Sequence, residues 1–201
     1  MKKELEKIGR SIKLYKVNME SPEQLSKLIK KVQEDFNTIN VLVHNAGIGQ
    51  RISFEEMTPE IWNKHIEANL NSAYYLLKET LPLMKKNNYG KVVLVGSLSS
   101  KIGGVVNAAY AASKGALNSL TKYLVQEYGV YGININVVAP GLVETDLYKE
   151  LASTNNLSGV EDTIPMRRLA RADEVANVVK FLSSKSSSYI NGETIYISGG
   201  R

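Results

Sequence analysis

Residues 91–114 read KVVLVGSLSSKIGGVVNAAYAASK and carry the pattern that decides the fold. The stretch opens with an apolar, mostly β-branched run at 92–95, which indicates a buried strand. A segment rich in glycine and serine follows and leads into a helical pattern that carries Tyr110 and Lys114. The stretch therefore predicts a strand, a loop and a helix in succession.

Tyr110 and Lys114 are spaced so that their side chains share one face of a helix, with Cβ atoms about 5–6 Å apart. A nearby ammonium favours the phenolate, so we expect Lys114 to lower the pKa of Tyr110 from its usual value of about 10. A phenol tuned in this way could exchange a proton with a substrate oxygen near neutral pH. Ser97, at the end of the predicted strand, could form a second hydrogen bond to that oxygen.

The Tyr-x-x-x-Lys pattern is weak evidence by itself, because the chain contains a second copy at Tyr74 and Lys78. Ile61 stands before Tyr74 at the place where Ser97 stands before Tyr110, and isoleucine has no hydroxyl group. We therefore expect Tyr74 and Lys78 to be ordinary helix residues at the surface and core. The rest of the sequence has to decide the role of Tyr110.

Length and composition limit the classes of protein that the chain can be. With 201 residues, 43% of them hydrophobic, it can bury one sizeable core, so a single domain over 1–201 is expected. No apolar run approaches the roughly 18 residues of a membrane span, and the first residues lack the apolar core of a signal peptide. The absence of cysteine excludes disulfides, thiolate nucleophiles and cysteine metal sites, and it fits a cytoplasmic protein. Two histidines, His44 and His65, are too few for a metal cluster, so no metal is expected.

The net charge of +5 and the pI near 9.2 are compatible with an acidic partner or nucleic acid. The lysines are scattered among glutamates, however, which indicates solvated surface. Nucleic-acid binding is not expected, because the chain lacks a clustered basic helix and stacking aromatics. The densest basic group is Arg167, Arg168 and Arg171, and these side chains could meet an acidic carrier protein or a phosphate.

Apolar strands alternate with amphipathic helices along the whole chain. The pattern predicts strands at 12–17, 39–43, 91–95, 133–138 and 194–197, and helices at 22–36, about 58–84, 108–128 and 173–182. This alternation is typical of an α/β fold with a parallel sheet covered on both faces. Residues 142–165 are polar and irregular enough to form a mobile lid.

Asn45, Ser97 and Pro140 each follow directly on a predicted strand. Ligands of such sheets bind beyond the carboxyl ends of the strands. The pattern therefore predicts one binding site at that edge of the sheet.

Several motifs together resemble one family. They are Asn45-Ala46-Gly47 after an apolar run, Asn69 in EANLNS, Ser97, Tyr110 with Lys114 in YAASK, and Pro140-Gly141 followed by Thr145-Asp146. In this order and at about this spacing they resemble the short-chain dehydrogenase/reductase family, over essentially the whole chain. Within the family the chain is most similar to 3-oxoacyl-acyl-carrier-protein reductases. The resemblance implies a Rossmann-like, doubly wound parallel sheet and hydride transfer between NADP or NAD and a carbonyl or secondary alcohol.

The resemblance also implies roles for four catalytic residues. Tyr110 would protonate the alkoxide, and Ser97 would steady the carbonyl oxygen. Lys114 would hold the nicotinamide ribose and keep the pKa of Tyr110 low. Asn69 would hold a water that relays protons through Lys114, although an amide at such a position is often only a helix-surface residue.

Further residues are implied in cofactor binding. The turn after the second predicted strand would face the cofactor, although a plain tight turn would give the same sequence. Thr145 could reach the cofactor amide or phosphate, although it could equally be a helix cap. The implied cofactor-binding residues besides Tyr110 and Lys114 are Asn18 near the adenine edge, Asn45, Ala46, Gly47, Pro140, Gly141, Val143 and Thr145.

One departure from the family pattern is serious. The family begins with a strand and a Thr-Gly-x-x-x-Gly-x-Gly turn that holds the pyrophosphate at a helix N-terminus, and no such spacing occurs here. By the family pattern, the chain lacks at least the first βαβ portion. The missing strands would lie between 12–17 and 39–43, so both would have unpaired edges, and poor solubility or failure to fold alone is expected. A start codon assigned too late, or a degraded gene, would explain this.

Two functions therefore remain open. The first is an NAD(P)-dependent reductase of a small carbonyl or acyl-thioester substrate, with acyl carrier protein as a partner and a tetramer implied by the resemblance. The second is a non-catalytic remnant or mis-started fragment that associates with full-length relatives. Enoyl reductases of this superfamily usually have a wider Tyr–Lys spacing, so the spacing here favours ketone chemistry.

Overall fold

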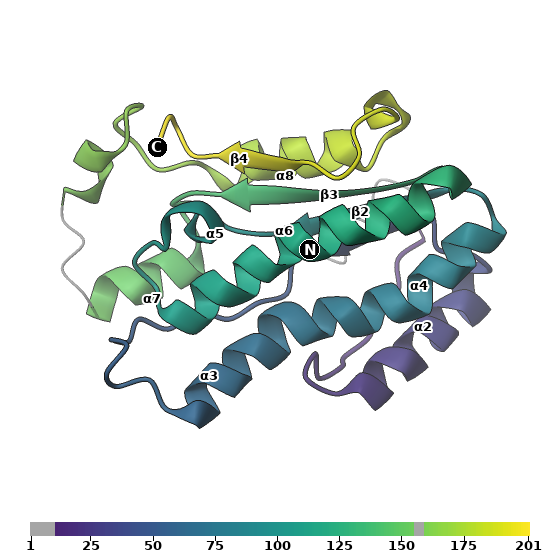
Figure 1. The fold of residues 1–201 in the computed structure, drawn as a ribbon, viewed down its shortest axis with the longest axis horizontal. Helices are drawn as coiled ribbons and strands as arrows, with labels where there is room; N and C mark the ends of the chain where they lie inside the picture. The colour runs from purple at the N-terminus through teal and green to yellow at the C-terminus, as the bar shows by residue number, and fades with distance from the viewer. Residues whose placement is uncertain (1–10, 155–158) are drawn as a thin grey trace.

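The computed structural model describes residues 11–154 and 159–201. In this part of the chain four strands form one sheet, ordered β1-β2-β3-β4, in which every neighbouring pair is parallel. The strands are β1 (Val41–His44), β2 (Gly90–Val95), β3 (Ile133–Pro140) and β4 (Thr194–Ile197). Parallel neighbours need crossover connections, and helices supply them (Figure 1). The predicted Rossmann-like α/β fold is confirmed.

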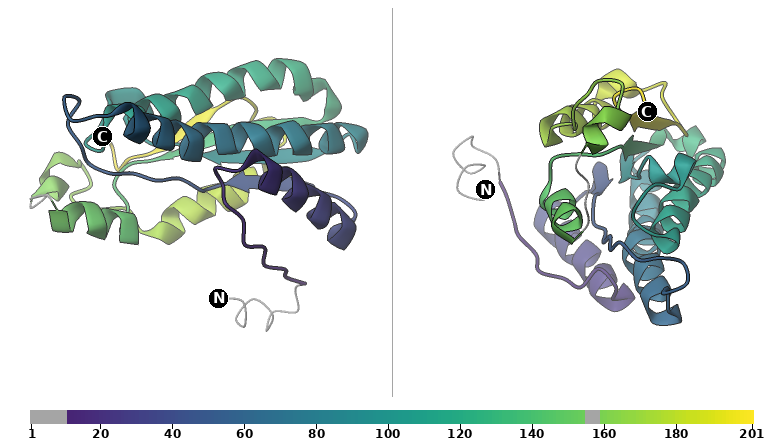
Figure 2. Two further views of the ribbon diagram at one scale, coloured as in Figure 1. Left: turned by 90° about the horizontal axis from the view of Figure 1, so that it is seen from below. Right: turned by 90° about the vertical axis from the view of Figure 1, so that its left-hand side faces the viewer.

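Helices cover both faces of the sheet (Figure 2). On one face, α2 (Pro22–Phe36), α4 (Ser72–Lys86) and α6 (Ala108–Tyr128) enclose the larger hydrophobic cluster. On the other face, α8 (Ala172–Leu182) packs over β2 and β3. The shorter elements are α3 (Pro59–Ile66), the π-helix η1 (Glu67–Asn71), α5 (Ser99–Ile102), α7 (Asp146–Thr154), and the 3-10 turns η2 (Gly129–Tyr131), η3 (Val160–Thr163) and η4 (Lys185–Ser187).

The alternation of side chains along β2 divides the core between the two faces. Val92 and Leu94 belong to the cluster under α2, α4 and α6, whereas Val93 belongs to the cluster under α8. All three side chains are 0% exposed, and each buried side chain of this size contributes about 1.5–3 kcal/mol. The unbroken apolar run in the sequence reflects this burial on both faces.

The strand β1 is covered on one face only. Leu42 packs against the larger cluster and His44 is buried, but Val41 and Val43 are 39% and 41% exposed. These two valines point toward the face on which α8 covers β2 and β3. The edge strand β1 therefore presents apolar surface to solvent.

The predicted strand at residues 12–17 is wrong. These residues form no strand in the structure, because a strand needs a neighbour with which to share hydrogen bonds and none of the described strands lies beside them. Asp35 near the end of α2 instead holds this segment, through Lys13 at 2.6 Å and the Tyr15 hydroxyl. Hydrogen bonds from Lys13 and then Tyr15 lower the pKa of Asp35 to about 2.

The single helix predicted from about 58 to 84 is interrupted. It consists of α3, the π-helix η1 and α4 in direct succession. Thr58 caps α3 by accepting a hydrogen bond from the Ile61 backbone N–H at 3.3 Å. A π-helix inserts one residue into the helical repeat, and such insertions are frequent at functional sites. Asn69 lies in the inserted turn.

The region predicted to be an irregular lid contains regular structure. The helix α7 and the turn η3 occupy part of 142–165, and Val143 forms an isolated parallel bridge with Ala170. Residues 155–158 lie outside the described residues. The prediction of an irregular segment is therefore wrong where α7 lies, because that amphipathic run is short and follows several loop-forming residues.

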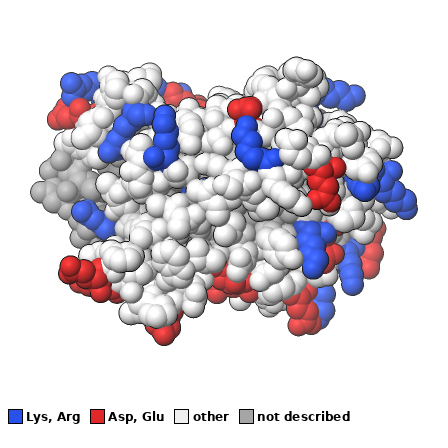
Figure 3. Space-filling model, viewed as in Figure 1, with Lys and Arg blue, Asp and Glu red and all other residues white. Residues whose placement is uncertain are grey.

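Charged side chains of both signs are interspersed on the face shown in Figure 3. The three arginines of the densest basic group each pair with a carboxylate of the same chain. Arg168 contacts Glu174 at 2.7 Å, and Arg171 and Arg167 contact Asp173 and Asp162 at 3.0 and 3.2 Å. Within 11–154 and 159–201, no helix is both long and apolar enough to cross a membrane.

Candidate active site

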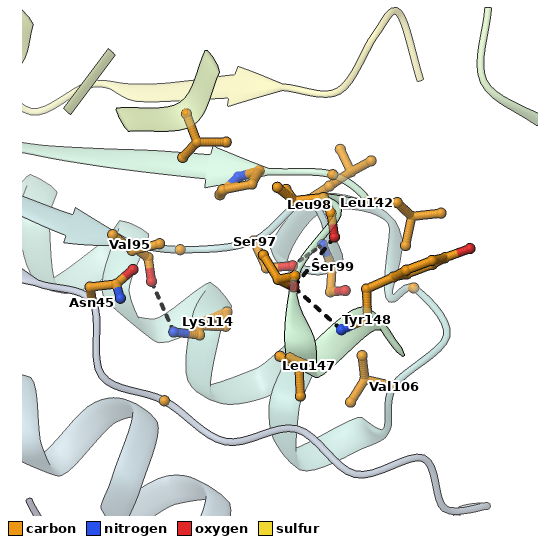
Figure 4. A pocket seen from close by; sticks show the side chains of 18 of the residues that line it. Asn45, Val95, Ser97, Leu98, Ser99, Val106, Lys114, Leu142, Leu147 and Tyr148 are labelled. Carbon is orange, nitrogen blue, oxygen red and sulfur yellow. Dashed lines mark hydrogen bonds between the residues drawn. The ribbon is translucent and has the colours of Figure 1, made fainter. Parts of the chain in front are cut away.

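A cavity of about 750 Å³ lies at the carboxyl ends of the strands. Loops that follow β1, β2 and β3 meet there with the first turns of α6 and α7 (Figure 4). The cavity brings together nine of the residues singled out in the sequence: Asn45, Gly47, Ser97, Tyr110, Lys114, Pro140, Gly141, Val143 and Thr145. Apolar side chains complete much of its wall, among them Leu98, Ile102, Val105, Val106 and Leu147.

Lys114 is almost completely enclosed, with only 3% of its surface exposed. Its Nζ donates a hydrogen bond to the carbonyl oxygen of Val95, the last residue of β2, at 2.8 Å (Figure 4). Burial penalises the ammonium form and lowers the pKa of Lys114 to about 8. The site therefore holds a cation that gives up its proton more readily than a surface lysine.

Tyr110 does not have the lowered pKa that the sequence predicted. Burial raises the pKa of the Tyr110 phenol, and a hydrogen bond with the Ser97 side chain opposes this rise in part. The Lys114 Nζ lies 5.9 Å from the centre of the Tyr110 ring and is directed at the Val95 carbonyl. The lowered pKa expected of Tyr110 is therefore wrong for this structure, because burial outweighs the opposing hydrogen bond from Ser97.

Ser97 is held in the loop between β2 and α5. Its Oγ accepts a hydrogen bond from the Ser99 backbone N–H at 3.1 Å, and its side chain also interacts with Tyr110. The adjacent Leu98 N–H donates to the Pro140 carbonyl at 2.7 Å, which ties this loop to the end of β3. The hydroxyl of Ser97 and the phenol of Tyr110 thus meet on one wall of the cavity.

Asn69 lies behind the cavity wall and is completely buried. Its Oδ1 accepts from the Ile48 N–H at 2.7 Å, and its Nδ2 donates to the Ile48 carbonyl at 3.1 Å and to Ser113 Oγ at 3.3 Å. A Cβ added to Gly47 would stand 2.9 Å from Asn69 Oδ1 and 3.2 Å from Lys114 Nζ. Asn69 therefore pins the turn after β1, and only glycine fits between it and Lys114.

Two of the predicted cofactor-binding residues, Asn18 and Ala46, do not line the cavity, and Thr145 also caps a helix. Asn18 forms the turn before α2, where its Oδ1 accepts from the Glu20 N–H at 3.0 Å, and it does not line the cavity. Ala46 lies between two cavity residues but is not itself in the cavity wall. Thr145 lines the cavity and also accepts from the Tyr148 N–H at 3.3 Å, as a helix cap does. The cofactor contacts expected of these residues stay predictions.

The second Tyr–Lys pair has no such surroundings. Tyr74 on α4 is 45% exposed, and the Lys78 Nζ lies 5.9 Å from its ring in the open. The expectation that this pair is ordinary helix surface is confirmed. Burial and the neighbouring Ser97 thus distinguish Tyr110 from a tyrosine with the same local sequence.

Sequence reasoning missed Asn107 and both histidines. Asn107 is the N-cap of α6, and its Oδ1 accepts from the Tyr110 N–H at 2.7 Å. An asparagine just before a helical pattern is a signal that could have found it. Ser72, the partner of His44, and Asn107, the side-chain partner of His65, lie 28 and 42 residues away in sequence, and no local pattern indicates these contacts.

Comparisons with known proteins agree with this geometry. A family model described as enoyl-(acyl carrier protein) reductase matches residues 1–201. The 3-oxoacyl-[acyl-carrier-protein] reductase FabG of Escherichia coli (strain K12) is 36% identical over 193 residues, which cover 96% of this chain and 79% of that protein. The chain belongs to the short-chain dehydrogenase/reductase family.

Other relatives of the family have different names. The 2-dehydro-3-deoxy-D-gluconate 5-dehydrogenase of Pseudoalteromonas atlantica is 34% identical over 198 residues, which cover 98% of this chain and 78% of that protein. Among solved structures, levodione reductase superimposes with a TM-score of 0.86 at 30% identity, over 92% of this chain and 74% of that one. An Agrobacterium tumefaciens protein with a proposed assignment as a gluconate dehydrogenase gives a TM-score of 0.93 at 30% identity, over 98% and 79%.

Membership of the family makes this chain an NAD(P)-dependent oxidoreductase. The side chains and backbone that line the cavity suit the nicotinamide and ribose end of such a cofactor, because they combine a buried cation, hydroxyl groups and glycine-containing turns. No Thr-Gly-x-x-x-Gly-x-Gly turn for the pyrophosphate occurs in the sequence. The residues present therefore fit one end of the cofactor.

Proposed function

We propose that this chain reduces the 3-oxo group of an acyl thioester, with NADPH or NADH as the hydride source. The observation that carries the proposal is the meeting of Tyr110, Ser97 and the buried Lys114 in one cavity at the strand ends. Tyr74 and Lys78 show that the same local sequence without these surroundings forms only helix surface.

The residues that would hold the cofactor surround this group. Lys114 would bind the ribose hydroxyls, and the backbone at Asn45 and Gly47 would approach the same part of the molecule. Pro140 and Gly141 would flank the nicotinamide ring, with Val143 and Thr145 beside its amide. When bound, the reduced cofactor supplies a hydride to the carbonyl carbon.

Tyr110 supplies the proton. Burial raises the pKa of the phenol, so Tyr110 is protonated at neutral pH and can donate its proton to the alkoxide oxygen. The oxygen of Ser97 accepts from the Ser99 N–H, so its hydroxyl hydrogen is the donor in the hydrogen bond with Tyr110. On substrate binding this hydrogen would turn to the same substrate oxygen. This protonation state suits the proton donor of a carbonyl reduction.

The walls of the cavity support an acyl substrate. Leu98 is buried, and Ile102, Val105 and Leu147 present apolar surface at 48%, 37% and 36% exposure. An acyl chain can cover such a surface, whereas a sugar acid would gain little from it. Acyl carrier protein as the donor of the thioester, a cytoplasmic location and a homotetramer are further parts of the proposal. The intact site residues favour an enzyme over a non-catalytic remnant.

The test is reduction of an acetoacetyl thioester, followed by the oxidation of NADPH or NADH. We expect Tyr110→Phe to lower kcat by about 100-fold or more, because it removes the proton donor. Tyr74→Phe is the matched control and should leave kcat unchanged. Equal turnover by Tyr110→Phe and the unmodified chain would contradict the proposal, and so would a folded chain without turnover on either cofactor.

A further inference from the structure

Both histidines are buried, and neither belongs to the proposed chemistry. His65 on α3 is 2% exposed. Its Nδ1 lies 2.8 Å from the Ile61 carbonyl oxygen, and its Nε2 lies 3.0 Å from Nδ2 of Asn107. A carbonyl can only accept, so Nδ1 carries the hydrogen and Nε2 accepts from the Asn107 amide. This arrangement requires the neutral Nδ1–H form of the ring.

The amide of Asn107 is fixed by matching partners on both of its ends. Besides His65, its Nδ2 group donates to the Gln50 carbonyl at 2.6 Å. Its Oδ1 accepts from the Tyr110 N–H at 2.7 Å. A reversed amide would set its oxygen against the Gln50 carbonyl and its NH₂ group against the Tyr110 N–H. His65 therefore helps to select the orientation in which Asn107 caps α6.

The cap matters because of where Tyr110 lies. The helix α6 begins at Ala108, so Tyr110 is in its first turn, where backbone N–H groups have no partner within the helix. Asn107 supplies the partner for Tyr110, and the Asn107 carbonyl accepts from the Ala111 N–H at 3.1 Å. The His65 side chain on α3 is thus linked through Asn107 to the backbone of Tyr110, the proposed proton donor.

We infer that His65 is a positioning residue for Tyr110, which as a neutral Nδ1–H imidazole holds the Asn107 amide in its capping orientation. The inference rests on the proposed function only for the role of Tyr110. The contact between His65 and the helix start can be tested without turnover.

His44 provides an internal comparison, since the structure gives it the opposite tautomer. The Ser72 hydroxyl donates to the Ala68 carbonyl at 2.7 Å, so the Ser72 oxygen accepts from Nε2–H of His44 at 2.8 Å. Nδ1 of His44 has no hydrogen-bond partner among the described residues. The two rings should therefore give different nitrogen spectra.

The first experiment is ¹⁵N NMR of the imidazole rings of the full chain at mildly alkaline pH, with His44→Gln to assign the signals. We expect one ring with a protonated Nδ1, assigned to His65, and one with a protonated Nε2. An Nε2–H or doubly protonated form of His65 would overturn the inference.

The second experiment compares His65→Gln, whose side-chain oxygen can accept from Asn107, with His65→Leu, which has no acceptor. We expect amide exchange at Tyr110 to become about fivefold faster in the leucine variant and to return toward the original rate in the glutamine variant. Exchange at Leu117, in the middle of α6, is the control and should not change.

Unchanged exchange at Tyr110 in His65→Leu, or equal acceleration along all of α6 in both variants, would overturn the inference in favour of packing alone. If the chain reduces the thioester, kcat should follow the same order with KM for the cofactor unchanged. Failure of the tautomer assignment removes the role of His65, whereas failure of the Tyr110→Phe test removes the proposed function.

Discussion

At the scale of single residues, the pKa of Tyr110 is shifted in the direction opposite to the one that the sequence motif predicts. The spacing of Tyr110 and Lys114 correctly indicates that they share a helix face, but spacing carries no information on burial. Burial raises the pKa of Tyr110 and lowers that of Lys114 to about 8. The pair therefore consists of a protonated phenol beside an ammonium group that loses its proton more readily than usual. The sequence predicted a phenol of lowered pKa beside an ordinary lysine.

The burial of Lys114 should cost stability. Its pKa in the folded chain is about 8 against the ordinary lysine value of 10.5. Between these pH values the unfolded chain binds more protons, so the free energy of unfolding rises with pH. We expect Lys114→Met to raise the free energy of unfolding at pH 7 by about 1–3 kcal/mol. The variant also removes the hydrogen-bond donor of the Val95 carbonyl, and this loss makes the gain smaller. The gain in stability should shrink as the pH rises toward 10.5, the pKa of the lysine in the unfolded chain.

Urea unfolding at several pH values measures this effect, and Lys78→Met on the exposed face of α4 is the control, expected to change little. The same Lys114→Met variant should lose reductase activity. A variant that is less stable than the original chain at pH 7 would contradict the prediction.

His44 should make the fold sensitive to acid. Burial, and to a smaller extent the charge of Lys114, lowers the pKa of His44 from 6.5 to about 4. The unfolded chain binds the proton first, so this contribution to stability is present above pH 6.5 and is lost as pH falls to 4. We expect His44→Gln to remove about 2–3 kcal/mol of the stability loss over that interval. The measurement is the free energy of unfolding at pH 6.5 and at pH 4. An equal loss between these two pH values in the original chain and in His44→Gln would disprove the prediction.

At the scale of elements, the π-helix η1 joins the helical layer to the site. It contains both Asn69, with three hydrogen bonds in the interior, and Asn71, whose Nδ2 bonds Glu67 at 2.5 Å nearer the surface. We expect Asn69→Ala to lower the free energy of unfolding by about 2–3 kcal/mol, because the Ile48 N–H and carbonyl lose their partners.

The matched variant Asn71→Ala should cost less than about 1 kcal/mol, since water can replace its contact. Thermal or chemical unfolding of the two variants provides the comparison. Equal losses would show that Asn69 does not pin the turn after β1.

The elements that the sequence predicts well are those whose pattern lies in neighbouring residues of the chain. The helix Ala108–Tyr128 and the strand Thr194–Ile197 have the predicted bounds, because apolar periodicity and flanking turn residues define them. Residues 12–17 have the composition of a strand, but a strand exists only through a partner. The π-helix escaped prediction because one inserted residue barely disturbs the apolar stripe. The His65–Asn107 contact joins distant positions through tertiary packing.

At the scale of the whole molecule, the sheet has one poorly covered edge. Val41 on β1 is 39% exposed, and no strand of residues 11–154 or 159–201 pairs with the outer edge of β1. This arrangement favours association with other chains. We expect Val41→Lys to reduce concentration-dependent association, because a charge on an edge strand opposes pairing. Sedimentation velocity over a range of concentrations measures it.

Phe54→Lys is the control for this prediction. Phe54 is 76% exposed but lies outside the strands and helices, so its replacement should affect association less. A larger effect of Phe54→Lys than of Val41→Lys would show that association does not depend mainly on the edge of β1.

The order of the sheet has a consequence for how the chain is made. Among the described strands, each from β2 onward pairs with the strand that precedes it in the chain, and none enters between two earlier ones. The sheet can therefore grow in one direction as the polypeptide leaves the ribosome, adding one strand at its open side with each crossover. Lys114 and its partner Val95 both precede β3 in the chain, so their contact does not depend on the pairing of β3 and β4.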